Sequence, residues 1–201
     1  MKNKHLPYFA LALFLFQSCD NSSNDSTKAA KESNDRKDST ELDSNTKLAN
    51  MTKMSAGPVD KDAASFTVDA ASGGMAEVAL GKFAMEHGKS GRVKAFGSMM
   101  VTDHTKVNNE LKALAIRKNI TLPNVPSNNA QRHMEKLMSK RGNDFDKSYM
   151  SMMLDDHKAD VADFLKTSKE CKDPDIKNFA IKTLPVLLVH LDSAKAITGK
   201  N

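Results

Sequence analysis

The chain has 201 residues, a length typical of one domain with short appendages, and a formal net charge of +5. Acidic and basic residues are interleaved, and the basic ones are not accompanied by aromatic residues, so nucleic acid is not an expected partner. The sequence has no glycine-rich phosphate loop, no zinc-type cysteine pairing and no nucleophile elbow, which excludes the enzyme classes that these motifs identify.

The N-terminus has the pattern of a signal peptide over residues 1–18. Lys2 and Lys4 form a positive start, the apolar run over 6–16 is too short to span a bilayer, and a small residue then precedes Cys19. This order resembles a lipoprotein signal, in which cleavage occurs before the cysteine and the thiol receives a lipid. We expect lipidation at Cys19, a membrane partner through that lipid, and a location in the cell envelope, on its periplasmic or outer-membrane face. An ordinary secretory peptide is the alternative.

Residues 19–60 contain the predicted lipid anchor and then a polar stretch. Ser, Asn, Asp, Lys and Thr dominate this stretch, and such a composition does not bury enough apolar surface to offset the entropy of ordering. We expect a disordered tether that joins the membrane to a domain over residues 61–199. With Cys19 lipidated, Cys171 has no partner for an intrachain disulfide.

From about residue 60 the apolar residues recur at spacings of three and four, which indicates helices. Ser90 and Pro174 suit helix starts, and Gly142 is expected to end a short helix in the long central link. Four long helices form two hairpins, whose apolar faces are buried when the hairpins pack together. The predicted fold is all-α, an antiparallel four-helix bundle, and whether the link crosses it stays open. The expected helices are about 60–87, 91–118, 131–140, 144–168 and 174–197.

Two segments repeat a local pattern. Residues 98–104 and 151–157 agree at five of seven positions, and each places Met four residues before His. Because residues four apart share a helix face, Met100 and Met153 lie beside these histidines. Thioether and imidazole together can hold copper(I), but methionine at helical spacing usually fills a core, so copper ranks below a harder metal.

Each long helix carries one potentially ligating residue on its apolar stripe. Glu77, His104, His157 and His190 each lie about a dozen residues from a hairpin turn, which places all four near mid-bundle at about 1.5 Å per residue. We interpret them as ligands of a metal ion, iron, zinc or manganese; the alternative without metal is that they hydrogen-bond one another, carboxylates or buried water. Additional ligands, or groups that orient the imidazoles, are expected among Asp103, Asp156 and Asp160, with Met100 and Met153 beside them.

Six short motifs are specific as a set: residues 77–81, 100–104, 144–146, 156–157, 184–185 and 190–191. With them the domain resembles a family of exported bacterial domains of unknown function, number 4142, which are regarded as ferritin-like. The resemblance implies a ferritin-like bundle outside the cytoplasm and no established activity. The ferritin-type di-iron pattern requires Glu three residues before His, where this chain has Val101, Leu154 and Leu187. A mononuclear, histidine-rich site is therefore easier to build.

The function that these patterns favour is an envelope-anchored bundle that binds a metal ion, with a role in metal handling or stress protection. The alternative is a structural or interaction module of the envelope that binds no metal. A redox-active ion with an open position would also permit enzymatic chemistry, but no substrate and no catalytic residue is indicated, so whether the chain is an enzyme stays open.

Overall fold

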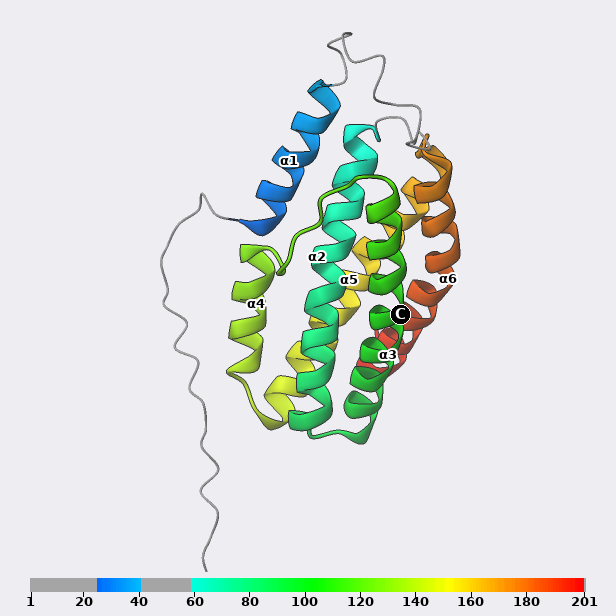
Figure 1. Ribbon diagram of the computed structural model, residues 1–201. Helices are drawn as coiled ribbons and strands as arrows, with labels where there is room; N and C mark the ends of the chain where they lie inside the picture. The colour runs from blue at the N-terminus through cyan, green and yellow to red at the C-terminus, as the bar shows by residue number, and fades with distance from the viewer. Residues whose placement is uncertain (1–24, 41–58, 201) are drawn as a thin grey trace, which may run out of the picture.

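The regular structure of the described part of the chain is entirely helical. The computed structural model describes residues 25–40 and 59–200, and no strand occurs within these ranges (Figure 1). The all-α prediction is confirmed for this part. No helix in it is both long and apolar enough to cross a membrane. The helices are α1 (Ser26–Thr40), α2 (Lys61–His87), α3 (Gly91–Arg117), α4 (Asn128–Met138), α5 (Gly142–Glu170) and α6 (Pro174–Thr198).

The four long helices begin and end within two residues of their predicted limits. Side-chain caps explain part of this agreement: Ser90 accepts a hydrogen bond from the first turn of α3, and Asp173 accepts two from the first turn of α6. The prediction for Gly142 is wrong. The short helix α4 already ends at Met138, and Gly142 begins α5 with a φ of 58°, a conformation that glycine adopts without steric cost.

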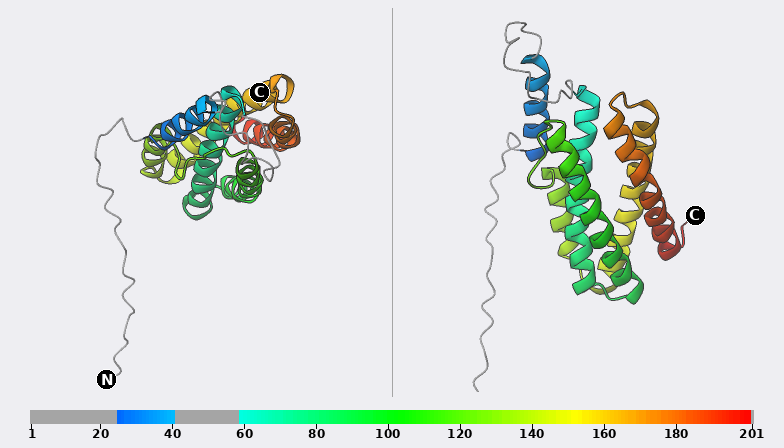
Figure 2. Two further views of the ribbon diagram at one scale, coloured as in Figure 1. Left: turned by 45° about the horizontal axis from the view of Figure 1, so that its top comes forward. Right: turned by 45° about the vertical axis from the view of Figure 1, so that its right-hand side comes forward.

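Two antiparallel hairpins, α2–α3 and α5–α6, make up most of the fold (Figures 1 and 2). In the first hairpin the two backbones approach closely at Gly81 and Gly97. A Cβ atom on either glycine would lie 2.7 Å from the carbonyl oxygen of the other. Because only residues without a side chain allow this approach, the glycine pair fixes the position of α2 against α3.

The hairpins face each other so that neighbouring helices are antiparallel. At one end, Arg92 near the start of α3 donates to the carbonyl oxygen of Ala196 near the end of α6, at 2.9 Å. At the other end, Lys118 Nζ lies 2.8 Å from Asp173 Oδ2. Asp146, in the first turns of α5, accepts hydrogen bonds from two backbone N–H groups after α2, at 2.9 and 2.7 Å. The start of α5 therefore lies at the end of α2.

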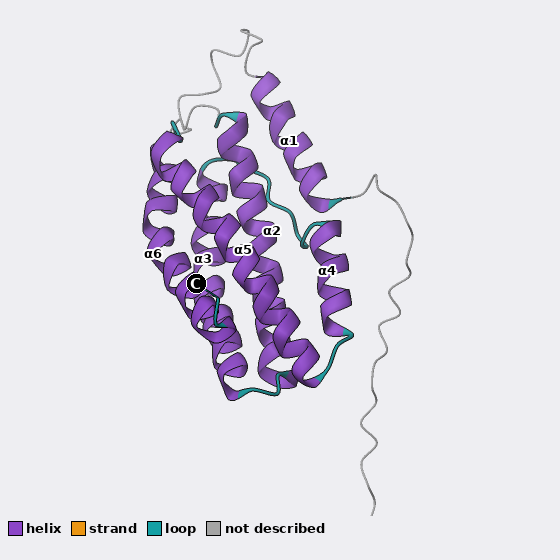
Figure 3. Cartoon of the chain, turned by 180° about the vertical axis from the view of Figure 1, so that it is seen from behind, coloured by secondary structure: helices purple, strands orange, loops and turns teal. Residues whose placement is uncertain are grey.

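The long link between the hairpins crosses α2 on the outside of the bundle. The backbone N–H of Ser127 donates to Ser72 Oγ of α2 at 2.9 Å, and α4 then packs along α2 and α5 (Figure 3). This path returns the chain to the end of the bundle at which α3 began, so α3 and α5 run in the same direction (Figure 1). Of the two paths that the sequence left open, the structure has the crossing.

The apolar core consists of two clusters, one toward each end of the bundle. The first cluster lies nearer the α2–α3 turn and includes Leu80 and Phe145. The second cluster lies nearer the α5–α6 turn and includes Leu111 and Ile176. On each long helix the polar residue predicted as a ligand lies between members of the two clusters, which shield it from both ends of the bundle.

Helix α1 corrects the prediction that residues 19–60 form a disordered tether. Ser26–Thr40 are helical and lie beside α2 (Figure 2). Disorder was predicted from the low apolar content of the segment itself. Helix α1 is instead stabilised by contacts with the rest of the chain. The predicted leader and residues 19–24 and 41–58 of the tether, Cys19 included, lie outside the described residues.

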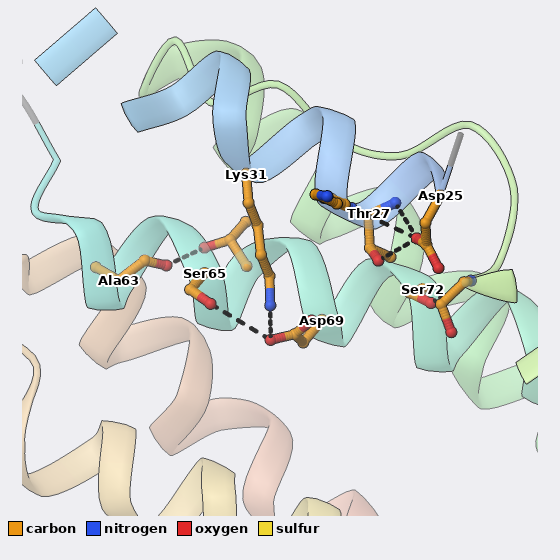
Figure 4. A network of polar contacts seen from close by, with 10 residues as sticks. Asp25, Thr27, Lys31, Ala63, Ser65, Asp69 and Ser72 are labelled. Carbon is orange, nitrogen blue, oxygen red and sulfur yellow. Dashed lines mark hydrogen bonds and ion pairs between the residues drawn. The ribbon is translucent and has the colours of Figure 1, made fainter. Parts of the chain in front are cut away.

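Polar contacts attach α1 to α2 and to the link. Lys31 of α1 reaches Asp69 of α2, with Nζ and Oδ2 2.7 Å apart (Figure 4). The buried Asn34 donates to the carbonyl oxygen of Thr121 at 3.0 Å and accepts from its backbone N–H at 2.8 Å. This two-way bond satisfies backbone groups of the link that would otherwise lack partners, so α1 is part of the folded domain.

Candidate metal centre

Four polar residues converge at mid-bundle, one from each long helix. Glu77 of α2, His104 of α3, His157 of α5 and His190 of α6 are each at most 5% exposed. The centres of the three imidazole rings lie 5.1–5.6 Å apart. The structure thus brings together all four residues that the sequence analysis interpreted as ligands.

Two of the imidazoles are oriented by groups that can only accept a hydrogen bond. His157 Nδ1 lies 2.9 Å from the carbonyl oxygen of Met153, and His190 Nε2 lies 2.9 Å from Asp103 Oδ2. A carbonyl oxygen or an ionised carboxylate has no proton to give, so both ring nitrogens must donate. In the neutral rings, His157 Nε2 and His190 Nδ1 are then left without a proton.

The third imidazole is oriented in the same way by Glu77. His104 Nδ1 donates to Glu77 Oε2 at 2.9 Å, while His104 Nε2 has no hydrogen-bond partner. On the other two rings, His157 Nε2 and His190 Nδ1 are only 3.2 Å apart. One nitrogen from each ring lies within 4.8 Å of the others. Buried lone pairs at such distances require a proton or a cation between them, because unsatisfied buried polar atoms are costly.

Glu77 directs its second oxygen to a further group of potential ligands. Glu77 Oε1 has no hydrogen-bond partner and lies 3.6 Å from His157 Nε2. Glu77, His157 and Asp160 each offer a ligand atom within 4.8 Å of the others. The site therefore combines three imidazoles with two carboxylates, a donor set that suits first-row transition metals.

Burial and neighbouring charges shift the pKa values of these groups. Burial alone would raise the pKa of Glu77, but the imidazoles, above all His104, lower it to about 2. Burial acts to lower the pKa of His104, yet the Glu77 carboxylate outweighs it and raises that pKa. Burial lowers the pKa of His190 to about 4. Burial and the Glu77 carboxylate raise the pKa of Asp160 well above its ordinary value. Without metal, the site thus holds an ionised Glu77 and a neutral His190, and the Glu77 carboxylate favours the protonated form of His104.

The buried, neutral His190 is expected to make the metal-free chain less stable as the pH falls from about 6.5 to 4, whereas Asp156, with its pKa raised to about 6, and Asp160, whose pKa is also raised, act in the opposite direction. Unfolding returns the pKa of His190 from about 4 to 6.5, so in this window the unfolded chain binds the proton first. The contribution of His190 to the free energy of unfolding then falls by up to about 3 kcal/mol, which the difference between the unchanged chain and a His190 variant isolates. Denaturant titrations with a chelator at several pH values measure this loss, and His190→Gln should remove it. An unchanged pH dependence in that variant would contradict the role assigned to His190.

The five residues that were expected to support the site differ in where they lie relative to the four converging residues. Asp103 orients the imidazole of α6, and Asp160 joins the second ligand group. Asp156 is exposed and belongs to neither group among the described residues, but partial burial and the nearby Glu77 carboxylate raise its pKa to about 6. Met100 and Met153 are members of the first apolar cluster, and Met153 contributes its carbonyl oxygen.

Two further polar side chains were not predicted, the buried Asp146 at the end of the bundle and the half-buried Asn108 near the site. Asp146, beside the buried Phe145, holds the α2–α3 turn through two backbone N–H groups. Asn108, one turn after His104, lies against Gly74, where a Cβ atom would collide with the Asn108 side chain. A carboxylate next to a buried aromatic residue was the available signal for Asp146, but its partners lie more than 50 residues earlier and cannot be read from local spacing.

Comparison with known proteins assigns the chain to a family and not to an activity. A family model described as Domain of unknown function (DUF4142) matches residues 48–197. The chain belongs to this family. The DUF4142 match extends from before α2 into the last turn of α6 and includes all four converging residues. No curated protein and no solved structure matches the chain.

Proposed function

We propose that this DUF4142 protein binds one transition-metal ion at mid-bundle, held by His104, His157 and His190 with Glu77 as the fourth ligand. One observation carries the proposal. Each imidazole donates from one nitrogen to an acceptor-only group, so that the remaining nitrogens of the neutral rings converge as lone pairs. Such orientation of histidines by outer hydrogen bonds is the usual arrangement around protein-bound metals.

A hydrogen-bonded network without metal accounts less well for the same atoms. A single proton can bridge His157 Nε2 and His190 Nδ1, which are 3.2 Å apart, and a protonated Asp160 can donate to Glu77, but His104 Nε2 still has no partner in the protein. One cation satisfies all four atoms. Zinc–nitrogen bonds of about 2.0–2.1 Å place tetrahedral ligands about 3.3 Å apart, which the His157–His190 pair already matches. The third imidazole lies within 4.8 Å of this pair and Glu77 Oε1 lies 3.6 Å from His157 Nε2, so both must move closer to bind the same ion.

The donor set narrows the choice of metal. Three imidazoles and a carboxylate suit zinc, iron or manganese. Val101, Leu154 and Leu187 replace the glutamates that a bridged di-iron centre requires, so the proposed centre is mononuclear. Copper ranks lower because Met100 and Met153 are accounted for as members of the apolar core.

We propose further that the bundle is of the ferritin-like type and is anchored in the cell envelope through a lipid on Cys19. The crossing link, which makes α3 and α5 run in the same direction, supports the first point (Figure 1). The apolar run and the cysteine at the end of the leader support the second. Metal handling or stress protection at the envelope is the role that follows. Incorporation of labelled palmitate into the full chain, and its loss in Cys19→Ser, tests the anchor.

The metal proposal is tested on the full chain purified in detergent and incubated separately with zinc, iron(II), manganese and copper(I). After desalting we expect about one equivalent of a bound metal by mass spectrometry. At a metal concentration of about 100 times Kd, removal of the metal should lower Tm by about 5–10 °C. Less than about a tenth of an equivalent with every metal would refute the proposal.

A second candidate function is an envelope interaction module that binds no metal. It is favoured by exposed apolar side chains on α6, namely Ile181, Leu188 and Val189, which are 48%, 42% and 58% exposed. This function predicts that Tm does not respond to metal or chelator. A Tm that falls on chelation would exclude it in this form.

A further inference from the structure

Two ligand groups at mid-bundle share one residue. His104, His157 and His190 form the first group, and Glu77, His157 and Asp160 form the second. His157 Nδ1 is occupied by its hydrogen bond to the carbonyl oxygen of Met153, so both groups must use His157 Nε2. A single lone pair binds one ion at a time. The two groups are therefore alternative positions for one ion.

The second ligand group borders a groove that the first does not reach. This groove has a volume of about 710 Å³ and lies between the N-terminal half of α2 and the C-terminal half of α5. Asp160 lines it and is also a member of the second group. None of the three histidines lines the groove. An ion that arrives through the groove thus reaches Asp160 before the histidines.

The charge of the groove favours cations. Carboxylates outnumber lysines in its lining by six to three, and an excess of one sign in a cleft raises both the local concentration and the association rate of the opposite sign. The acids are Asp60, Asp62, Asp69, Asp160, Asp163 and Glu170.

Glu77 connects the two positions. Its side chain is 7% exposed, and the two oxygens serve different neighbours. Oε2 accepts from His104 of the first group, whereas the unpartnered Oε1 is the oxygen on the side of His157 Nε2. An ion in the second group is bound to Glu77, His157 and Asp160. It would enter the first group by losing Asp160 and gaining the imidazoles of His104 and His190.

The geometry points to Asp160 as the capture ligand of this site. A divalent cation enters through the α2–α5 groove, binds first to Asp160, Glu77 and His157, and then passes to the three histidines. This inference rests on the proposed function, because it assigns a route to the same metal. Asp160 contributes to the rate at which metal enters and leaves, and little to the final affinity.

Cobalt(II) is a suitable probe because its visible absorption changes when imidazoles replace water. The full chain and Asp160→Asn are mixed with cobalt(II) in a stopped-flow instrument, and the equilibrium Kd is measured separately. We expect Asp160→Asn to slow loading by at least about tenfold, to slow extraction by a chelator by a similar factor, and to change Kd by less than about threefold. Asp163→Asn is the matched control, since Asp163 is an exposed groove residue outside both ligand groups, and it should load at nearly the normal rate.

The possible results of this experiment distinguish failure of the proposed entry route from failure of the proposed metal site. Equal loading rates in Asp160→Asn and the unchanged chain would overturn the route while leaving the metal site intact. If Asp160→Asn weakened metal affinity by the same factor as it slowed loading, Asp160 would be a permanent ligand of the bound metal. This result would also overturn the route. If the unchanged chain bound no cobalt, zinc or iron, the proposed function itself would fail. Asp160→Ser provides the same comparison if circular dichroism shows that Asp160→Asn does not fold.

Discussion

Replacing His157 by Gln is expected to weaken metal binding by at least about 100-fold. Loss of an outer partner of a ligating histidine typically costs about 10- to 100-fold in affinity, and loss of the ligand itself should cost more. His157 is the most central ligand, since its Nε2 lies 3.2 Å from His190 Nδ1 and 3.6 Å from Glu77 Oε1. Gln keeps a polar side chain of similar length but supplies no imidazole nitrogen. Competition with a chromophoric chelator measures the affinity.

An exposed histidine provides the control for this experiment. His133 lies on the surface of α4 and outside the ligand groups found among the described residues. His133→Gln should therefore bind metal with unchanged affinity. If the two variants bound metal equally well, the ion would not be held at mid-bundle, whatever the stoichiometry of the unchanged chain.

Replacing Gly81 by Ala is expected to lower the free energy of unfolding by about 2–3 kcal/mol. The new Cβ atom would lie 2.7 Å from the carbonyl oxygen of Gly97 and 3.1 Å from Met100 Cβ. Backbone and Cβ atoms cannot rotate away, so α2 and α3 would have to separate along the hairpin. Gly97→Ala would create the reciprocal clash with Gly81 and should have a similar effect. Denaturant unfolding of the metal-free chain measures both.

Gly73 supplies a matched control in the same helix. A Cβ atom at Gly73 meets no atom within 4 Å, so Gly73→Ala should stabilise the chain by up to about 1 kcal/mol through its helix propensity. Both substitutions gain the helix propensity of alanine. The difference between their free energies of unfolding therefore measures the cost of the close approach at Gly81. Equal stability of the two variants would mean that the hairpin does not depend on the glycine contact.

The positions of the four long helices and the convergence of their ligands could be predicted because the relevant distances are fixed by helix geometry. Because the rise per residue of an α-helix is constant, residues equally far from a turn in the sequence lie equally deep in the bundle. This places Glu77 and the three histidines at the same depth. The sequence could also have indicated which neighbouring aspartate lies closer to His157 around the helix. Around a helix, Asp160 lies about 60° from His157 and Asp156 about 100° from it, which agrees with Asp160 being the less exposed of the two and a member of a ligand group.

Other features depend on contacts between distant segments and could not be read from local patterns. Asp103 directly precedes His104 in the sequence, yet it orients His190 on another helix. Helix α1 has a composition typical of a tether, but Asn34 finds both backbone groups of Thr121 in the link. In both cases the partner is more than 80 residues away in the chain, so only the folded arrangement determines the contact.

The absorption fine structure at the zinc K-edge of the zinc-loaded chain tests the central claim most directly. Three imidazoles and one carboxylate from four helices should give a shell of three nitrogens and one oxygen at about 2.0–2.1 Å, with the outer scattering of imidazole rings. A shell made of oxygen atoms without ring scattering, or a shell that contains sulfur, would contradict a metal centre built from His104, His157, His190 and Glu77.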